Sequence, residues 1–162
     1  MALNWGDKAD VRDYWLRVLT NEAYLRSDGT VHNGAFGGKA ISQPDDRAWS
    51  LELSGRLLSL VKDVEAEARA FCGDKMPFIG VLYQSVENLR TDGTSPLPGF
   101  PTDIVYTPRA GDNAHADHVA YGPTAEHKFA LRDWLQDFIQ AVDSTQCNVV
   151  EQLRANAPSG AA

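Results

Sequence analysis

Residues 103–122 (DIVYTPRAGDNAHADHVAYG) hold the densest group of side chains able to do chemistry in this chain. They include two of the four histidines, His115 and His118, together with Arg109 and Asn113. A histidine titrates near neutral pH and an arginine binds anions, so this combination suits a metal-independent acid–base site. The alternative for each histidine is a structural role inside a half-buried strand. We expect that role for His118 and leave both roles open for His115.

A metal site is a third interpretation of the same stretch. The run His115-x-Asp117-His118 resembles the second half of the H-x-H-x-D-H motif of the metallo-β-lactamase-like hydrolases, with Asn113 where the first histidine of that motif stands. An open catalytic zinc site needs three protein ligands plus water. The two cysteines of the chain lack the spacing of metal ligands. We therefore predict no structural zinc and no cofactor, and keep a metal-dependent hydrolase as an alternative.

An arginine-to-histidine spacing occurs twice, in RSDGTVH from Arg26 to His32 and in RAGDNAH from Arg109 to His115. It resembles the signature of the HEPN ribonucleases. That resemblance implies arginines that position a scissile phosphate and histidines that assist proton transfer. HEPN domains are helical bundles, whereas both copies here lie in Gly- and Asp-rich chain beside predicted strands.

A second resemblance covers more of the chain and joins the same two regions. Three pieces are similar, in order and spacing, to a family of small bacterial proteins without an assigned function: GTVHNGAF at 29–36, WSLEL at 49–53 and YTPRAGDNAHADHVAYG at 106–122. The resemblance points to Phe36, Asn113, His115 and Gly122. Together with the doubled spacing, it predicts that the 29–38 loop and the 110–115 turn lie close together and form one polar pocket.

The polar stretch itself is predicted to be a β-hairpin. β-branched and aromatic residues favour a strand over Asp103–Thr107, the Gly, Asp and Asn residues of 110–113 favour a turn, and His115–Tyr121 is the return strand. Side chains alternate along a strand, so His115 and Asp117 should share one face while His118 points to the other.

Apolar periodicity predicts the remaining elements. A helix is expected from Asp10, because Val11, Tyr14, Trp15, Val18 and Leu19 follow a helical stripe. The other predicted elements include strands at Trp49–Leu53 and Phe78–Tyr83, with a helix from Pro77 to Leu89 as the alternative for the second strand. A helix from Arg56 that ends at Gly73 and a last long helix capped by Thr124 complete the set, the last with a stripe at Leu131, Trp134, Leu135, Phe138, Ile139 and Val142. The fold is therefore α+β: a small, mostly antiparallel sheet of about four strands with three helices packed on it.

Length and charge limit the classes of function. The 162 residues suit a single domain, which we place at 1–154, followed by a flexible tail at 155–162. The net charge of −7 argues against a surface that follows duplex nucleic acid, and no apolar run is long enough to span a bilayer. The N-terminus does not resemble a signal peptide, and the separated Cys72 and Cys147 suit a reducing cytoplasm.

We expect a small cytoplasmic binding or interaction module, such as an immunity or regulatory partner, that recognises another protein or a small anionic ligand. One alternative is a metal-independent enzyme acting on a phosphate-bearing substrate. In that enzyme, His32 and His115 share the acid–base work. The substrate anion is then held by Arg26, Arg109 and Asn113. A metal-dependent hydrolase is the second alternative.

Overall fold

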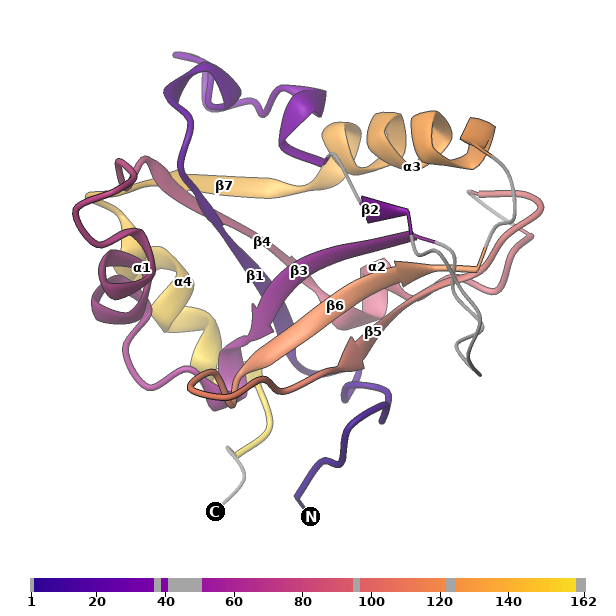
Figure 1. Cartoon of the computed structure of the whole chain (residues 1–162), viewed down its shortest axis with the longest axis horizontal. Helices are drawn as coiled ribbons and strands as arrows, with labels where there is room; N and C mark the ends of the chain where they lie inside the picture. The colour runs from indigo at the N-terminus through magenta and orange to yellow at the C-terminus, as the bar shows by residue number, and fades with distance from the viewer. Residues whose placement is uncertain (1, 37–38, 41–50, 95–96, 122–124, 160–162) are drawn as a thin grey trace.

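The computed structural model describes residues 2–36, 39–40, 51–94, 97–121 and 125–159 (Figure 1). Its strands are β1 (Tyr14–Leu19), β2 (Lys39–Ala40), β3 (Leu51–Leu57), β4 (Gly80–Ser85), β5 (Thr102–Tyr106), β6 (His115–Ala120) and β7 (Gln140–Asp143). Its helices are α1 (Val64–Cys72), α2 (Val86–Leu89), α3 (Ala125–Phe138) and α4 (Cys147–Gln152), and its 3-10 turns are η1 (Glu22–Tyr24), η2 (Asn33–Phe36), η3 (Leu58–Leu60) and η4 (Leu153–Asn156).

The strands form one antiparallel sheet in the order β5-β6-β3-β1-β4-β7, with the short β2 also paired to β3. The predicted α+β class and the antiparallel sheet are confirmed. The predicted strand number was too low, because β1, β2 and β7 were not expected. Among the described helices, none is long and apolar enough to cross a membrane.

The predicted first helix is wrong, since its residues form the central strand β1. Six register pairs join β1 to β4, from Tyr14 opposite Ser85 to Leu19 opposite Gly80. A strand that is covered on both faces carries apolar side chains on both, so it lacks the alternation that distinguishes a strand from a helix. Trp15 on one face and Leu16 on the other are both buried.

The second predicted helix begins later than expected. The chain remains extended through Leu57, and α1 starts at Val64 with Asp63 as its N-cap, whose carboxylate accepts from the Ala66 amide at 2.9 Å. Its predicted end is confirmed: Gly73 takes φ 54° just after the last turn. Such a positive φ favours glycine.

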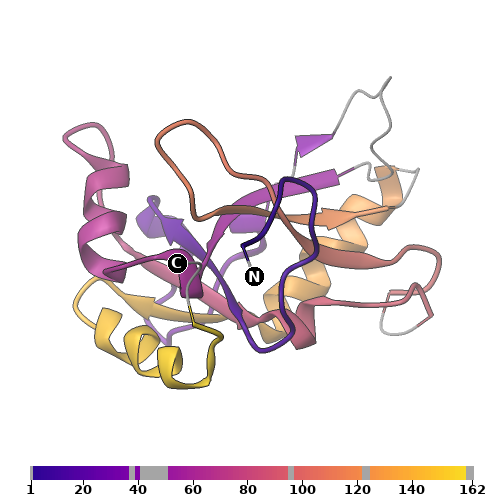
Figure 2. The same ribbon diagram turned by 90° about the horizontal axis from the view of Figure 1, so that it is seen from below.

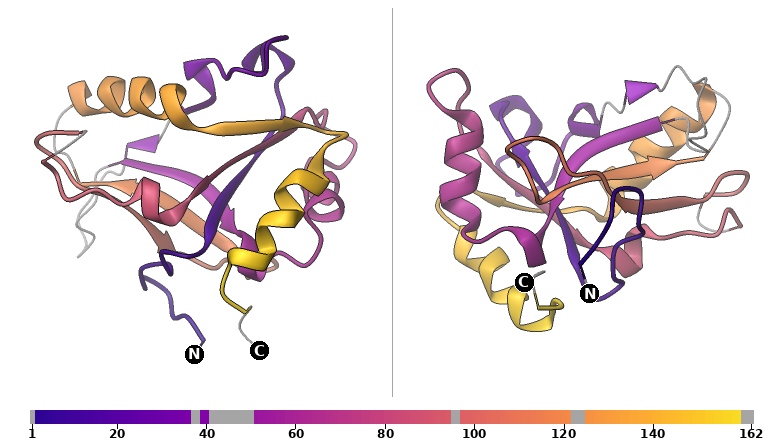
Figure 3. Two further views of the ribbon diagram at one scale, coloured as in Figure 1. Left: turned by 180° about the vertical axis from the view of Figure 1, so that it is seen from behind. Right: turned by 60° about the horizontal axis from the view of Figure 1, so that its bottom comes forward.

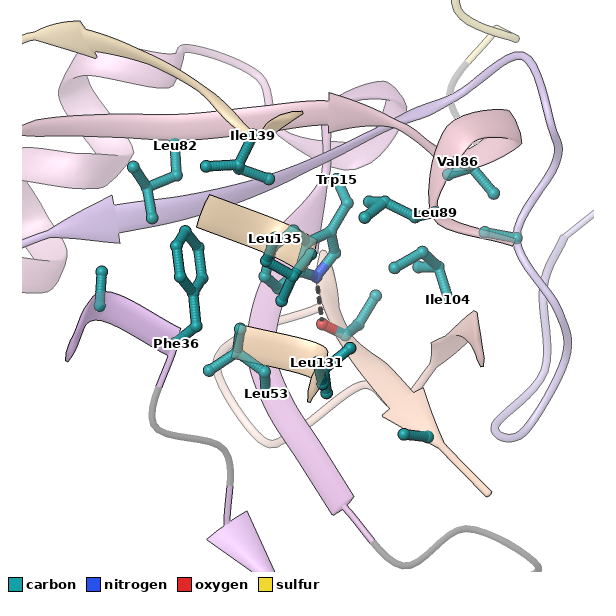
Figure 4. Packing of buried hydrophobic residues seen from close by; sticks show 14 of the residues in the cluster. Trp15, Phe36, Leu53, Leu82, Val86, Leu89, Ile104, Leu131, Leu135 and Ile139 are labelled. Carbon is teal, nitrogen blue, oxygen red and sulfur yellow. Dashed lines mark hydrogen bonds between the residues drawn. The ribbon is translucent and has the colours of Figure 1, made fainter. Parts of the chain in front are cut away.

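Two apolar cores lie on the two faces of the sheet. One packs α2, α3 and η2 against the face that carries Trp15 and Leu82 (Figure 4). The other packs α1, α4 and η3 against the face that carries Leu16 and Val81. The helices α1 and α4 lie side by side, well away from α3 (Figure 3).

The last helix and the chain ends agree in part with the sequence. Leu131, Leu135 and Ile139 of the predicted stripe are buried, and Val142 belongs to β7 instead of the helix. The predicted cap Thr124, the strand start Trp49 and Gly122 lie outside the described residues. The turn η4 reaches Asn156, so the predicted tail begins in ordered chain, and residues 160–162 are not described.

Candidate functional site

A cavity opens where two neighbouring strands separate. β1 and β3 are joined only at Trp15 opposite Leu57 and Leu16 opposite Arg56, after which β1 continues along β4 and β3 along β6. The two strands diverge from this point (Figure 1). A cavity of about 360 Å³ occupies the fork, lined by residues of both strands, of α1 and of the β5–β6 turn. This volume lies in the range of small-molecule sites. Figure 2 shows α1 and the β5–β6 turn at the same end of the molecule.

The cavity combines an apolar interior with several charged groups. Its apolar lining comes from β1, β4, α1 and the chain between β3 and α1, and comprises Leu16, Val18, Val61, Val64, Ala68 and Val81. Phe71 and Met76 also line it and are exposed to solvent. Its charged and polar lining comprises Arg17, Ser54, Arg56, Glu67, Arg109, Asp112 and His115.

Arg17 reaches across the fork from β1. Its Nη1 donates to the Ser54 carbonyl of β3 at 2.5 Å, in place of the backbone hydrogen bond lost where the strands diverge. This is the one hydrogen bond of its guanidinium among the described residues. Burial lowers the pKa of Arg17, and Asp117 attracts the charge from beyond ion-pair distance, opposing that shift. A guanidinium has five N–H groups, so the others remain available for an anion.

Arg56 connects three elements around the cavity. It extends from β3 and meets the Asp112 carboxylate of the β5–β6 turn through Nε at 3.1 Å and Nη2 at 3.0 Å. Its guanidinium also lies 5.1 Å from the ring centre of Phe71, on α1. These contacts with one carboxylate and one aromatic ring use most of the binding capacity of this arginine.

The Glu67 carboxylate serves the start of α1. Its Oε2 accepts from the amides of Lys62 at 2.6 Å and Asp63 at 3.2 Å, so it caps amides that precede the helix. The two acidic groups that line the cavity, Glu67 and Asp112, thus both have partners in the described chain.

His115 belongs to a buried polar chain with Thr107 and Asp117. Its Nδ1 lies 2.8 Å from the Thr107 carbonyl, an acceptor, so Nδ1 carries the proton of the neutral ring. The Thr107 hydroxyl donates to Asp117 Oδ2 at 2.8 Å. His115 Nε2 and Asp117 Oδ1 are 3.9 Å apart, and both are covered and without a hydrogen bond. Although the ring lines the cavity, neither nitrogen is open to a ligand.

His118 points to the opposite face, as its strand position predicts. It is buried between Trp15 and Trp134, with ring centres 5.9 Å and 6.3 Å away. Burial lowers the pKa of His118 to about 4; the Leu89 carbonyl nearby, outside hydrogen-bonding geometry, offsets only part of this effect. His118 is therefore a neutral core residue.

The second arginine–histidine pair lies elsewhere. Arg26 and His32 are exposed, on the η1–η2 segment at the end of the sheet opposite the β5–β6 turn (Figure 1). Arg26 contacts Thr30, and His32 stacks on Tyr24 and accepts from the Gly34 amide. Neither residue lines the cavity beside the β5–β6 turn. The predicted shared pocket is thus wrong for Arg26 and His32, because they lie at the opposite end of the sheet from that turn.

The remaining expected site residues divide between the cavity and its surroundings. Arg109 and His115 line the cavity, whereas the Asn113 carbonyl accepts from the Tyr106 hydroxyl at 2.8 Å and its side chain is not part of the lining. Phe36 is buried in the core under α3. Both copies of the HEPN-like spacing lie in turns and extended chain.

Sequence reasoning missed Arg17 and Arg56. Arg17 lies outside the apolar stripe of the predicted first helix. It is the one charged residue in the run YWLRVL, which becomes informative once that run is a strand. Arg56 carried no signal, because its importance comes from Asp112, 56 residues further along the chain.

The described residues bring no three histidine, cysteine or carboxylate side chains together in a group that could hold a metal ion. His118 points away from His115 and Asp117, so the metallohydrolase-like run does not converge. Comparisons of the chain with protein-family models, with curated proteins and with solved structures found no match.

Proposed function

We propose that this protein is a binding module for a small organic anion, which it holds in the cavity between β1, β3 and α1. The observation that carries this proposal is Arg17, a partly buried arginine in the cavity that has, among the described residues, one backbone acceptor and no carboxylate within ion-pair distance. A buried charge is costly unless it is paired, and an anionic ligand supplies the missing partner. The surrounding apolar residues suit a ligand with an apolar body.

The state of His115 supports binding rather than catalysis. A general base needs a nitrogen within hydrogen-bond reach of its substrate. Here Nδ1 is engaged by Thr107, and Nε2 is covered against Asp117. A metal-independent reaction on a phosphate-bearing substrate therefore requires a rearrangement of this strand end, whereas binding requires none.

The cytoplasm remains the proposed compartment. Cys72 and Cys147 are both free and buried, and burial raises the pKa of each thiol. Thiols of this kind are unreactive packing residues and suit a reducing environment.

The test compares an alkyl carboxylate of medium chain length with the alcohol of the same length, by calorimetry on the full chain. We expect the carboxylate to bind and the alcohol to bind at least about tenfold more weakly, since a hydrogen bond to a charged group contributes about 1.5–3 kcal/mol. Arg17→Gln should remove this preference, and Arg17→Lys should keep part of it.

Arg12→Gln is the matched control, because Arg12 is an exposed arginine whose guanidinium is paired with Asp10 at 2.7 Å. Thermal unfolding of each variant checks that the sheet is intact. Equal binding of acid and alcohol refutes an anion site. Equal losses in the Arg17 and Arg12 variants refute the cavity as its location.

A further inference from the structure

We propose that the natural ligand is a dianion and that Arg109 is the residue that selects it. This inference rests on the anion site proposed above and extends it from one arginine to two. Arg17 holds one negative charge in the fork of the sheet, and Arg109 receives a second from the β5–β6 turn.

The pairing of charged groups around the cavity leads to this assignment. Asp112 is the carboxylate nearest in sequence to Arg109, but both its oxygens face Arg56. Glu67 is turned toward the amides before α1. Among the described residues, Arg109 has no side-chain partner, while its backbone pairs with that of Asp112. Arg17 and Arg109 thus both line this cavity, and neither has a carboxylate partner in the part of the chain that the structure describes.

The turn holds Arg109 in place. Its amide donates to the Asp112 carbonyl at 3.1 Å, and the Asp112 amide donates to the Arg109 carbonyl at 2.9 Å. Gly111 takes φ 79° within this turn, a conformation that favours glycine. The bond from Arg56 to Asp112 then fastens the turn to β3. The backbone of Arg109 is therefore fixed, although its side chain is exposed.

Arg17 comes from β1 and Arg109 from the β5–β6 turn, and apolar residues also line the cavity. A single carboxylate on an apolar chain uses Arg17 alone. A ligand with two negative charges uses both, either as a dicarboxylate or as a phosphate monoester. The shared chemistry is a dianion with an apolar body, and recognition of planar or tetrahedral anions by arginine suits both kinds of group.

The experiment measures binding of three probes of matched chain length to the wild-type chain: an alkyl monocarboxylate, the corresponding dicarboxylate and the alkyl phosphate. We expect at least one dianion to bind about three- to tenfold more tightly than the monocarboxylate, as one further exposed charge-assisted contact allows. The probe that shows this preference identifies the kind of dianion.

Arg109→Gln should bring the affinity for the preferred dianion down to that for the monocarboxylate and leave the monocarboxylate nearly unchanged. Arg26→Gln, at the far end of the sheet, is the control and should alter neither. Equal affinities in the wild type, or a preference that survives Arg109→Gln, overturn this inference while leaving the single-anion site standing. If none of the three probes binds the wild type, the proposed function itself is refuted.

Discussion

The indole ring of Trp15 lies directly over Gly55, and its Nε1 donates to the Ala116 carbonyl at 3.1 Å (Figure 4). A Cβ at position 55 would lie 2.3 Å from Nε1 and 2.5 Å from the Leu16 carbonyl oxygen. The absence of a side chain at Gly55 thus allows β1 to cross β3 closely. The fork that forms the cavity begins at this crossing.

Gly55→Ala should therefore destabilise the protein by about 2–3 kcal/mol or more, since overpacking a tight interior forces the backbone to shift. The measurement is the denaturant midpoint of unfolding. Trp15→Phe replaces the indole by a smaller ring and should itself destabilise the protein. The double variant with Gly55→Ala should lose less free energy of unfolding than the sum of the two single losses. Additive costs would show that the indole is not what excludes a side chain at position 55.

Protonation of His118 should make stability depend on pH. Its folded pKa of about 4 lies below the ordinary 6.5 because of burial, so the unfolded state takes up a proton first as the pH falls. Stability from this group is complete above about pH 6.5 and is lost progressively toward pH 4, by about 3 kcal/mol in all.

The check is the free energy of unfolding of the wild type and of His118→Leu across this pH range. The wild type should lose stability relative to His118→Leu as the pH falls, because leucine takes no proton. Comparing the two chains cancels the pH dependence that comes from other groups. One of these is Asp13, because burial raises its pKa. A difference that stays constant from pH 7 to about pH 4 would mean that His118 is accessible to water.

α3 should contribute to stability through its buried face. Leu135 is fully buried in the core that also contains Trp15, so Leu135→Ala should cost about 2–5 kcal/mol. Trp134 is only half-buried, so truncating it should cost less than truncating Leu135. Phe129→Ala on the exposed side of the same helix is the control and should alter stability by less than about 0.5 kcal/mol. Similar midpoints for the Leu135 and Phe129 variants would place α3 outside the core.

The Arg56–Asp112 pair should fasten the hairpin turn measurably. It is partly buried and joined through two nitrogens, so a double-mutant cycle with Arg56→Gln and Asp112→Asn should give a coupling of about 1–2 kcal/mol. The exposed pair of Glu65 and Arg69, separated by 3.7 Å, is the matched control and should give about 0.5 kcal/mol or less. Equal couplings in the two cycles would mean that the turn is held by its backbone alone.

Much of the fold follows from local sequence. The hairpin was predictable because β-branched strands flank a Gly-Asp-Asn turn, and its alternation correctly separated His115 and Asp117 from His118. The long helix was predictable because its apolar residues recur at helical spacing. In each case the decisive interactions lie within a few residues of one another.

The cavity could not be predicted in this way. Arg17, Ser54 and Arg109 come from three separate segments, and only the ladder registers and the crossing at Gly55 bring them to one place. The doubled spacing suggested that Arg26 and Arg109 share one pocket, but their segments lie at opposite ends of the sheet (Figure 1). Local patterns predicted β3 to β6, α1 and α3 in outline, whereas β1 was predicted to be a helix and β2 and β7 were not expected. Which charged residues face each other was decided by tertiary structure, because strand order and register depend on burial across the whole sheet.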